Sequence, residues 1–211
     1  MLAFGDGCKL LDTGEDPVPR LISCTTEGGG ETRYRVPLGE FERFAAARPE
    51  KVSNGWTQEH AIFNETLGPH QLIGQDLWFG LTFYDGEGRT GVGGFGFFDP
   101  RTRQFEIRYP SEIADWSVSS FLVEDDAIWL GLEARGEGHP YSGGLIRWDR
   151  ATQEIVRWAE APRALAIVRE GDRLYMPTDE GAAIFENGEF HRYLLDVDRD
   201  GEYRLVRREL R

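Results

Sequence analysis

The sequence has little cysteine and no long hydrophobic run. Only two of its 211 residues are cysteines, Cys8 and Cys24, whereas secreted scaffolds held by disulfides usually have more. We expect two free, buried thiols, with a Cys8–Cys24 bridge as the alternative. No stretch approaches the ~20 apolar residues of a membrane span, and Met1–Asp6 lacks the basic start and apolar core of a signal peptide. The sequence therefore predicts a soluble, cytoplasmic protein without a membrane partner.

Basic residues are also scarce. Lys and Arg total 24 against 37 Asp and Glu, which leaves a formal net charge of −13. A surface this acidic repels phosphate backbones, so nucleic acid is not expected as a partner. Basic partners, cations and metal ions remain compatible with the charge, and a requirement for solubility alone would also account for it.

The usual signatures of catalysis are missing. The sequence contains no Gly-x-x-x-x-Gly-Lys phosphate loop, no Cys or His pair at zinc spacing and no Gly-x-Ser-x-Gly elbow. The glycine-rich run Gly91–Gly96 lies between predicted strands rather than before a helix, so it is not a dinucleotide fingerprint. No residue is therefore assigned a catalytic role.

What the sequence does have is an internal repeat. Leu77–Leu81 (Leu-Trp-Phe-Gly-Leu) returns as Ile128–Leu132 (Ile-Trp-Leu-Gly-Leu), an offset of 128 − 77 = 51 residues. Asp99 and Asp149 begin matching Asp-x-x-Thr turns at an offset of 149 − 99 = 50. A side chain at this turn position caps backbone N–H groups, so both aspartates are predicted to be structural. A repeat of this length indicates a modular all-β array.

The apolar pattern within each unit predicts four short strands. The two inner strands are near-continuous apolar runs, which implies burial on both faces. The outermost strand alternates instead, with Phe105, Ile107 and Tyr109 on one face and Glu106 and Arg108 on the other. A radially stacked sheet needs this gradient, because its inner strands lie between neighbouring sheets and its outer strand meets water.

These features resemble a β-propeller with kelch-like or two-component-regulator-propeller blades. The resemblance rests on the Trp-containing strands, the Gly-Gly pairs before each third strand and the Asp turns, and it covers most of the chain. It implies an all-β fold of about four to five four-stranded blades, either closed or a half-ring that dimerises. We place blade-like units at about 8–47, 70–110, 117–159 and 162–195, a closing strand at about 202–210 that pairs with the N-terminal unit, and a long loop insertion at 45–69.

In such blades the loop between the second and third strands shares a face with the connections between blades. Two long loops of that kind and the insertion 45–69 therefore meet on one face, which is the predicted ligand-binding site. The alternative is that the loops are solvated turns and that the insertion's aromatic residues are only buried anchors. The candidate residues are Glu87, Arg89, Glu137, His139, Tyr141, Trp56 and His60.

A calcium loop is the one cofactor site that the sequence suggests. Asp196, Asp198 and Asp200, followed by Gly201, match the first half of such a loop. Its ninth and twelfth positions hold arginines, where calcium ligands are expected. We therefore favour a β-hairpin in which residues 193–195 and 203–206 flank the Asp200-Gly201 turn.

Two functions follow from this pattern. The one we favour is a non-enzymatic binding or scaffold module that recognises a protein or small ligand through the loop-rich face, with a homodimer as a further option. The alternative is a metal-dependent hydrolase or lyase of the propeller type, with carboxylates at the central channel. The residues that close the predicted second strands are not uniformly acidic, which disfavours the enzyme; they are Thr25, Leu81, Leu132 and Thr178.

Overall fold

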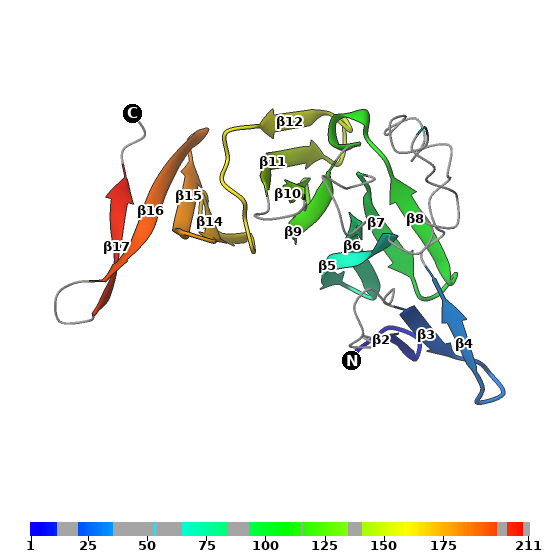
Figure 1. Ribbon diagram of the computed structural model, residues 1–211. Coiled ribbons are helices and arrows are strands. Elements are labelled where there is room, and N and C mark those ends of the chain that lie inside the picture. Colours follow the sequence, from blue (N-terminus) through cyan, green and yellow to red (C-terminus); the bar gives the residue numbers. More distant parts are fainter. Residues whose placement is uncertain are drawn as a thin grey trace. The chain divides into compact units, whose positions relative to one another are not determined.

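The chain forms antiparallel sheets grouped in two compact units. The computed structural model describes residues 1–11, 21–35, 53, 65–83, 93–114, 116–134, 141–197 and 202–208. Unit 1 consists of Met1–Val118 and Ala134–Pro140, and unit 2 of Ser119–Glu133 and Tyr141–Arg211. The described residues form four sheets of four or five strands (Figure 1). The predicted all-β class is confirmed, and the sheets are consistent with propeller-like blades.

Unit 1 contains two four-stranded sheets whose strands follow one another along the chain. The first sheet has the order β1-β2-β3-β4 and the second β5-β6-β7-β8, and a short 3₁₀ turn follows the second. The elements are β1 (Leu2–Phe4), β2 (Cys8–Leu11), β3 (Leu21–Thr25), β4 (Glu31–Tyr34), β5 (Glu65–Ile73), β6 (Asp76–Phe83), β7 (Phe95–Asp99), β8 (Gln104–Arg108) and η1 (Ser111–Ile113).

Unit 2 contains the other two sheets, apart from the terminal residues of two strands that belong to unit 1. The third sheet has the order β12-β11-β10-β9, and the last sheet has the order β13-β14-β15-β16-β17. Their strands are β9 (Ser117–Val123), β10 (Ala127–Ala134), β11 (Tyr141–Asp149), β12 (Ile155–Trp158), β13 (Val168–Glu170), β14 (Arg173–Thr178), β15 (Gly181–Glu186), β16 (Glu189–Val197) and β17 (Tyr203–Arg208).

Burial across the sheets follows the predicted gradient. Every residue of β10 is buried, as expected for a strand covered on both faces. The outer strand β8 alternates: Phe105 and Ile107 pack on the core, whereas the Glu106 side chain is 57% exposed. The position of a strand within its sheet therefore determines whether it needs one apolar face or two.

The core of unit 1 lies between its two sheets. Leu10 and Ile22 from the first sheet belong to the same buried cluster as Leu77 and Phe79 from the second. Phe98 is completely buried, and the centroids of the Phe98 and Phe105 rings are 4.9 Å apart. Burial of an aliphatic or aromatic side chain of this size contributes about 1.5–3 kcal/mol, so this interface is a main source of stability for the unit.

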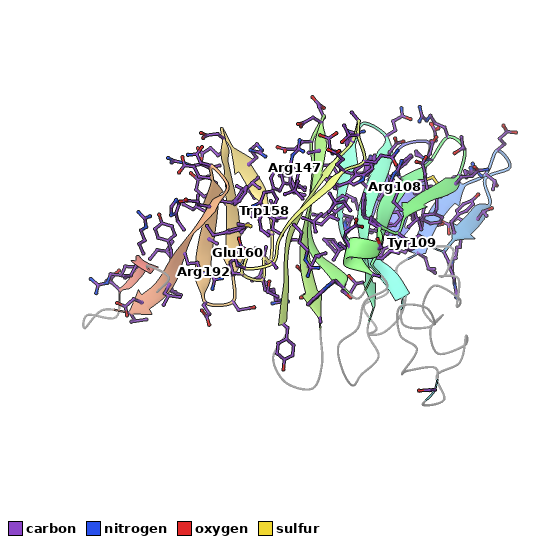
Figure 2. The ribbon with its side chains drawn as sticks, turned by 90° about the horizontal axis from the view of Figure 1, so that it is seen from above. Arg108, Tyr109, Arg147, Trp158, Glu160 and Arg192 are labelled. Carbon is purple, nitrogen blue, oxygen red and sulfur yellow. A yellow bond between two sulfur atoms is a disulfide. The ribbon has the colours of Figure 1, made fainter. Side chains whose placement is uncertain are left out.

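The core of unit 2 is built around aromatic rings from both of its sheets. Trp129 stacks on Trp158 with centroids 5.8 Å apart, and the Phe185 ring contacts Trp158 edge-on at 4.8 Å. Figure 2 shows Trp158 on this interface. Beside it, Arg192 Nη2 donates to the carbonyl of Glu160 at 2.5 Å, which ties β16 to the chain segment between the two sheets.

The two predicted Asp turns have the same construction. The Asp99 Oδ1 atom accepts a hydrogen bond from the backbone N–H of Arg101 at 2.8 Å. Asp149 Oδ1 accepts the N–H groups of Ala151 and Thr152, each at 3.0 Å. Both aspartates are therefore structural, as predicted, and the fifty-residue repeat is reproduced at the level of single hydrogen bonds.

Two predicted boundaries were wrong. The first sheet begins at Leu2 rather than near residue 8, so β3 is its third strand and not its second. A three-residue strand such as β1 is too short to show a period. Strand β5 begins at Glu65, inside the predicted insertion 45–69. The strand can include Pro69 because Gly68 and Pro69 lie at a register shift, where the N–H that proline lacks is not needed for a ladder hydrogen bond. Of the insertion, 45–52 and 54–64 lie outside the described residues.

The C-terminal strand exists but does not pair as predicted. β17 pairs antiparallel with β16, with Leu205 opposite Leu195 and Arg207 opposite Tyr193. The pairing of the two predicted hairpin strands is therefore confirmed, whereas the Asp200-Gly201 turn lies outside the described residues. The prediction that this strand pairs with the N-terminal unit is wrong. A hairpin partner a few residues away costs much less loop-closure entropy than a partner at the other end of the chain.

The two cysteines form a disulfide, so the prediction of free thiols was wrong. Cys8 on β2 lies directly opposite Cys24 on β3, with 4.0 Å between their Cα atoms. The next pair along the ladder is hydrogen-bonded, since Thr25 N–H donates to Gly7 O. The cysteines thus occupy a non-hydrogen-bonded pair, where opposed side chains approach most closely. The strand register brings the two thiols together, and the low number of cysteines in the sequence did not indicate this.

Removal of this disulfide is expected to destabilise unit 1. The bridge joins residues 16 positions apart, and a loop of that size corresponds to about 3 kcal/mol of unfolding free energy. We expect a Cys8→Ser/Cys24→Ser variant to lose about this amount in urea unfolding without reductant. Wild-type protein treated with a thiol reductant should match the variant. Equal unfolding midpoints for the untreated wild type and the variant would contradict the assignment.

The Asp99 turn predicts a specific acid sensitivity. Hydrogen bonds from Arg101 lower the pKa of Asp99 from 3.8 to about 2 in the folded protein. A carboxyl with a depressed pKa stabilises the fold above its unfolded pKa and loses that contribution as the pH falls through the folded value. Thermal melts from pH 4 to pH 2 should therefore show a steeper loss of stability in the wild type than in Asp99→Asn. Parallel profiles would rule out this role.

Candidate functional site

Most of the predicted ligand-binding residues lie outside the described part of the chain. This applies to Glu87, Arg89, Glu137, His139, Trp56 and His60, whose convergence stays a prediction. Tyr141 is described; it is the first residue of β11 and is 49% exposed. The site is therefore built from Tyr141 and from the residues that the structure places at the same end of these strands.

An ion-pair cluster lies at that end. Glu133, near the end of β10, is 1% exposed although it is charged. Arg163, in the segment between β12 and β13, donates from Nε to Glu133 Oε2 at 2.5 Å. Its Nη1 donates to both carboxylate oxygens of Asp179 at 2.7 and 2.9 Å, and Asp179 lies between β14 and β15. One guanidinium therefore joins the ends of strands from two sheets.

The cluster runs from the protein interior to solvent. The Glu133 side chain is 2% exposed, that of Arg163 14% and that of Asp179 51%. Burial alone would lower the pKa of Arg163, but hydrogen bonds and attraction from Asp179 and Glu133 outweigh burial and raise that pKa. Arg163 therefore stays charged and balances the carboxylate that the fold has buried.

Neighbouring contacts hold the same region together. Ser142 Oγ, next to Tyr141, donates to the carbonyl of Ala161 at 2.7 Å. The Leu165 N–H donates to the carbonyl of Pro177 at 2.9 Å. In unit 2, the end of β10, the start of β11 and the segment between β12 and β13 therefore lie on one side. We call Glu133, Tyr141, Ser142, Arg163 and Asp179 the loop end.

Only Tyr141 of the five loop-end residues was among the candidates. Sequence reasoning missed Glu133, Ser142, Arg163 and Asp179, although one signal was visible. Glu133 is a charged residue directly after the apolar run Ile128–Leu132, where a fully covered strand demands a counter-charge. The identity of that counter-charge depended on packing between sheets and could not be read from spacing.

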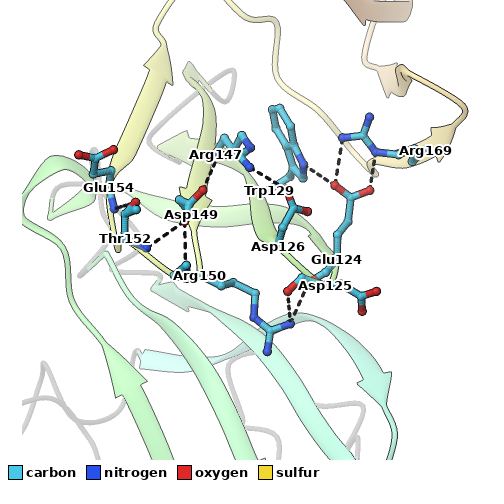
Figure 3. Close-up of polar contacts among 11 residues, drawn as sticks. Glu124, Asp125, Asp126, Trp129, Arg147, Asp149, Arg150, Thr152, Glu154 and Arg169 are labelled. Atoms are coloured by element: carbon cyan, nitrogen blue, oxygen red, sulfur yellow. Dashed lines mark hydrogen bonds and ion pairs between the residues drawn. The ribbon is translucent and has the colours of Figure 1, made fainter.

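A second polar network lies at the opposite end of the same strands (Figure 3). Glu124 accepts a hydrogen bond from Trp129 Nε1 at 2.8 Å and another from Arg169 Nη2 at 3.0 Å. The guanidinium of Arg169 also lies 5.5 Å from the Trp129 ring. On the neighbouring turn, Arg147 pairs with Asp126 at 2.9 Å. These groups satisfy one another, so we assign this network to the stability of unit 2.

The predicted calcium site is described only at its first position. Asp196 pairs with Arg204 at 3.2 Å, and its side chain is 51% exposed. Asp198 and Asp200 lie outside the described residues. Within the described ranges, no group of three or more His, Cys, Asp or Glu residues could hold a metal ion. Calcium binding by this loop stays a prediction.

Solved structures with a similar fold exist. The extracellular domain of BT4673 from B. thetaiotaomicron, named as a one-component system, superposes with a TM-score of 0.53 and 12% identity over 96% of this chain. A structure of the BT4673 extracellular domain named as part of a hybrid two-component system has a TM-score of 0.46, with 12% identity over 90% of this chain. This chain spans 23% and 25% of their lengths. No protein-family model and no curated protein matches the chain.

At this identity the likeness shows the fold alone, but it bears on the expected location. The structure with the higher TM-score is an extracellular domain, and disulfides such as Cys8–Cys24 persist mainly in oxidising compartments. The prediction of a cytoplasmic location was therefore wrong. Among the described residues, we find no helix with the length and hydrophobicity needed to span a bilayer.

Loss of the Arg163 charge is expected to destabilise unit 2. In Arg163→Met, the buried Glu133 carboxylate loses its ion pair with Arg163, so we expect a loss of about 3 kcal/mol in unfolding free energy. Arg173→Met is the matched control, because Arg173 pairs with Glu186 at 2.8 Å while its side chain is 48% exposed. That variant should lose less than about 1 kcal/mol. Equal losses in urea unfolding would show that burial of Glu133 is not the determining factor.

Proposed function

We propose that the chain is a non-enzymatic, ligand-binding part of a larger protein that acts outside the cytoplasm, with its sheets serving as propeller blades. The chain spans only 23% of the similar extracellular domain, which supports the proposal that it is part of a larger protein. The Cys8–Cys24 disulfide supports the oxidising compartment. The loop end of unit 2 is the surface through which the ligand binds.

The observation that carries the proposal is the buried ion-pair cluster itself. Burying the Glu133 carboxylate is costly. Arg163, which pairs with Glu133, extends this buried contact to the surface because its Nη1 donates to both carboxylate oxygens of Asp179. The result is a rigid base from which two different side chains face solvent: the half-exposed Asp179 carboxylate and the half-exposed Tyr141 ring. Binding sites are commonly built in this way, from loop residues on a rigid sheet scaffold.

The chemistry of the loop end indicates the class of ligand. A carboxylate accepts hydrogen bonds from ammonium or guanidinium groups, and a tyrosine ring supplies an apolar surface that also attracts cations. The net charge of −13 favours the approach of the same class. The ligand is therefore a peptide or small molecule that presents a positively charged group.

A panel of small probes tests this proposal. Lysine- and arginine-containing dipeptides and the polyamine spermidine are added at millimolar concentration, and thermal unfolding is followed by fluorescence. Because a ligand that binds only the folded state stabilises it, we expect at least one cationic probe to raise the Tm. Tyr141→Ala and Asp179→Asn should each remove that rise.

Two controls separate this effect from general charge attraction. Val156→Ala changes a residue that is 48% exposed on β12, away from the loop end, and should keep the full response. Glutamate-containing dipeptides should have no effect on any variant. An unchanged Tm with every cationic probe, or an equal rise in wild type and Tyr141→Ala, would reject the loop end as the binding surface.

A further inference from the structure

The Asp179 carboxylate at the loop end is already occupied on one side. Arg163 Nη1 donates to Asp179 Oδ1 at 2.7 Å and to Asp179 Oδ2 at 2.9 Å. A single nitrogen at nearly equal distances from both oxygens lies in the notch between them, where two parallel hydrogen bonds from a planar donor pair would otherwise form. The Asp179 side chain is 51% exposed, so a ligand reaches it at the outer sides of its two oxygens.

The protein interior holds Arg163 in this position. Its Nε donates to Glu133 Oε2 at 2.5 Å, and the Arg163 side chain is only 14% exposed. A ligand that drew the guanidinium away from Asp179 would also break its contact with Glu133, whose side chain is 2% exposed. Leaving a buried carboxylate without its partner is strongly unfavourable. A ligand therefore binds Asp179 beside Arg163 and does not replace it.

From this geometry we propose that the loop end selects ligands with a primary ammonium group over ligands with a guanidinium group, a selectivity that rests on the proposed function. A guanidinium owes its strength as a carboxylate partner to its fork of parallel N–H donors. Arg163 fills the notch of Asp179 that this fork requires. An ammonium is a compact charge with three donors that can rotate, so it binds one outer oxygen lone pair without losing a second bond.

The neighbouring groups do not reverse this preference. The half-exposed Tyr141 ring attracts either kind of cation, and at an exposed site this attraction is weak beside a charge-assisted hydrogen bond. Glu180, the residue after Asp179, is exposed and attracts both cations through its charge alone. The exposure of Asp179 also lets an ammonium keep part of its hydration shell. The filled notch therefore decides between the two classes, and the ligand carries an alkylamine, such as a lysine side chain or a polyamine.

Two matched probes test this selectivity. n-Butylamine and n-butylguanidine each carry one positive charge at neutral pH on the same alkyl chain, and n-butanol is the uncharged control. Binding is followed by NMR titration of the backbone amide signals of Asp179 and Glu180. In the wild type we expect n-butylamine to bind about fivefold more tightly than n-butylguanidine, because only the guanidinium loses its second hydrogen bond. n-Butanol should leave both signals unchanged.

A double variant opens the notch. Arg163→Met/Glu133→Gln removes the arginine together with the buried charge that it balances, and circular dichroism checks that the protein is folded. A guanidinium can then form both hydrogen bonds to Asp179, so we expect the preference to reverse, with n-butylguanidine about fivefold tighter. Arg173→Met is the matched control, because it removes an arginine charge from β14 and leaves the notch filled. This variant should keep the wild-type preference.

The wild-type preference decides the proposal by itself, whether or not the double variant folds. If n-butylguanidine binds the wild type as tightly as n-butylamine, or more tightly, the ammonium selectivity is overturned while cation binding at the loop end stands. An unchanged preference in a folded double variant overturns the selectivity as well. If neither cation shifts the two amide signals, the selectivity and the proposed function are both rejected.

Discussion

The structure depends on one constraint, which is that each sheet must bury an apolar face against a neighbouring sheet. In unit 1 the two sheets share a cluster around Leu10, Ile22 and Phe79, and in unit 2 they share one around Trp129 and Phe185. Sheets that are buried in this way leave few positions for polar side chains. The exception in β10, Glu133, is tolerated because Arg163 supplies a charge from the adjacent segment. Stability and the candidate site therefore arise from the same packing.

The repeat was predictable because some of its recurring residues are required by close contacts between neighbouring strands. A Cβ atom on Gly80 would lie 2.4 Å from a methyl group of Val118, and one on Gly131 would lie 2.1 Å from Ser120 Oγ. Both glycines follow the shared Trp-x pattern at an offset of 51 residues, so the close approach recurs with the repeat. Local signals of this kind, together with the Asp turns, determine the strand order within a sheet.

Features that depend on pairing register were not predictable. Cys8 and Cys24 face each other because the register of β2 and β3 places them directly opposite one another. The short strand β1 that precedes them has too few residues to show a sequence period. Most residues of the loop end could not be predicted from the sequence for a related reason. Tyr141 was identified from its place after a long loop, whereas Arg163 gains its role from two carboxylates that are 30 and 16 residues away in sequence. Sequence spacing contains no information about such three-way contacts.

The last sheet shows a mismatch between its sequence pattern and its burial. A strand covered on one face only should alternate apolar and polar residues. Strand β14 instead reads Leu-Tyr-Met-Pro from position 174, and β15 reads Ala-Ala-Ile-Phe from position 182, so both are apolar on both faces like the fully covered β10. Within unit 2 they bury one face, and Leu195 and Leu205 extend the other face to the hairpin edge. The amino-acid pattern of this sheet is that of a central layer, and a central layer requires a second cover.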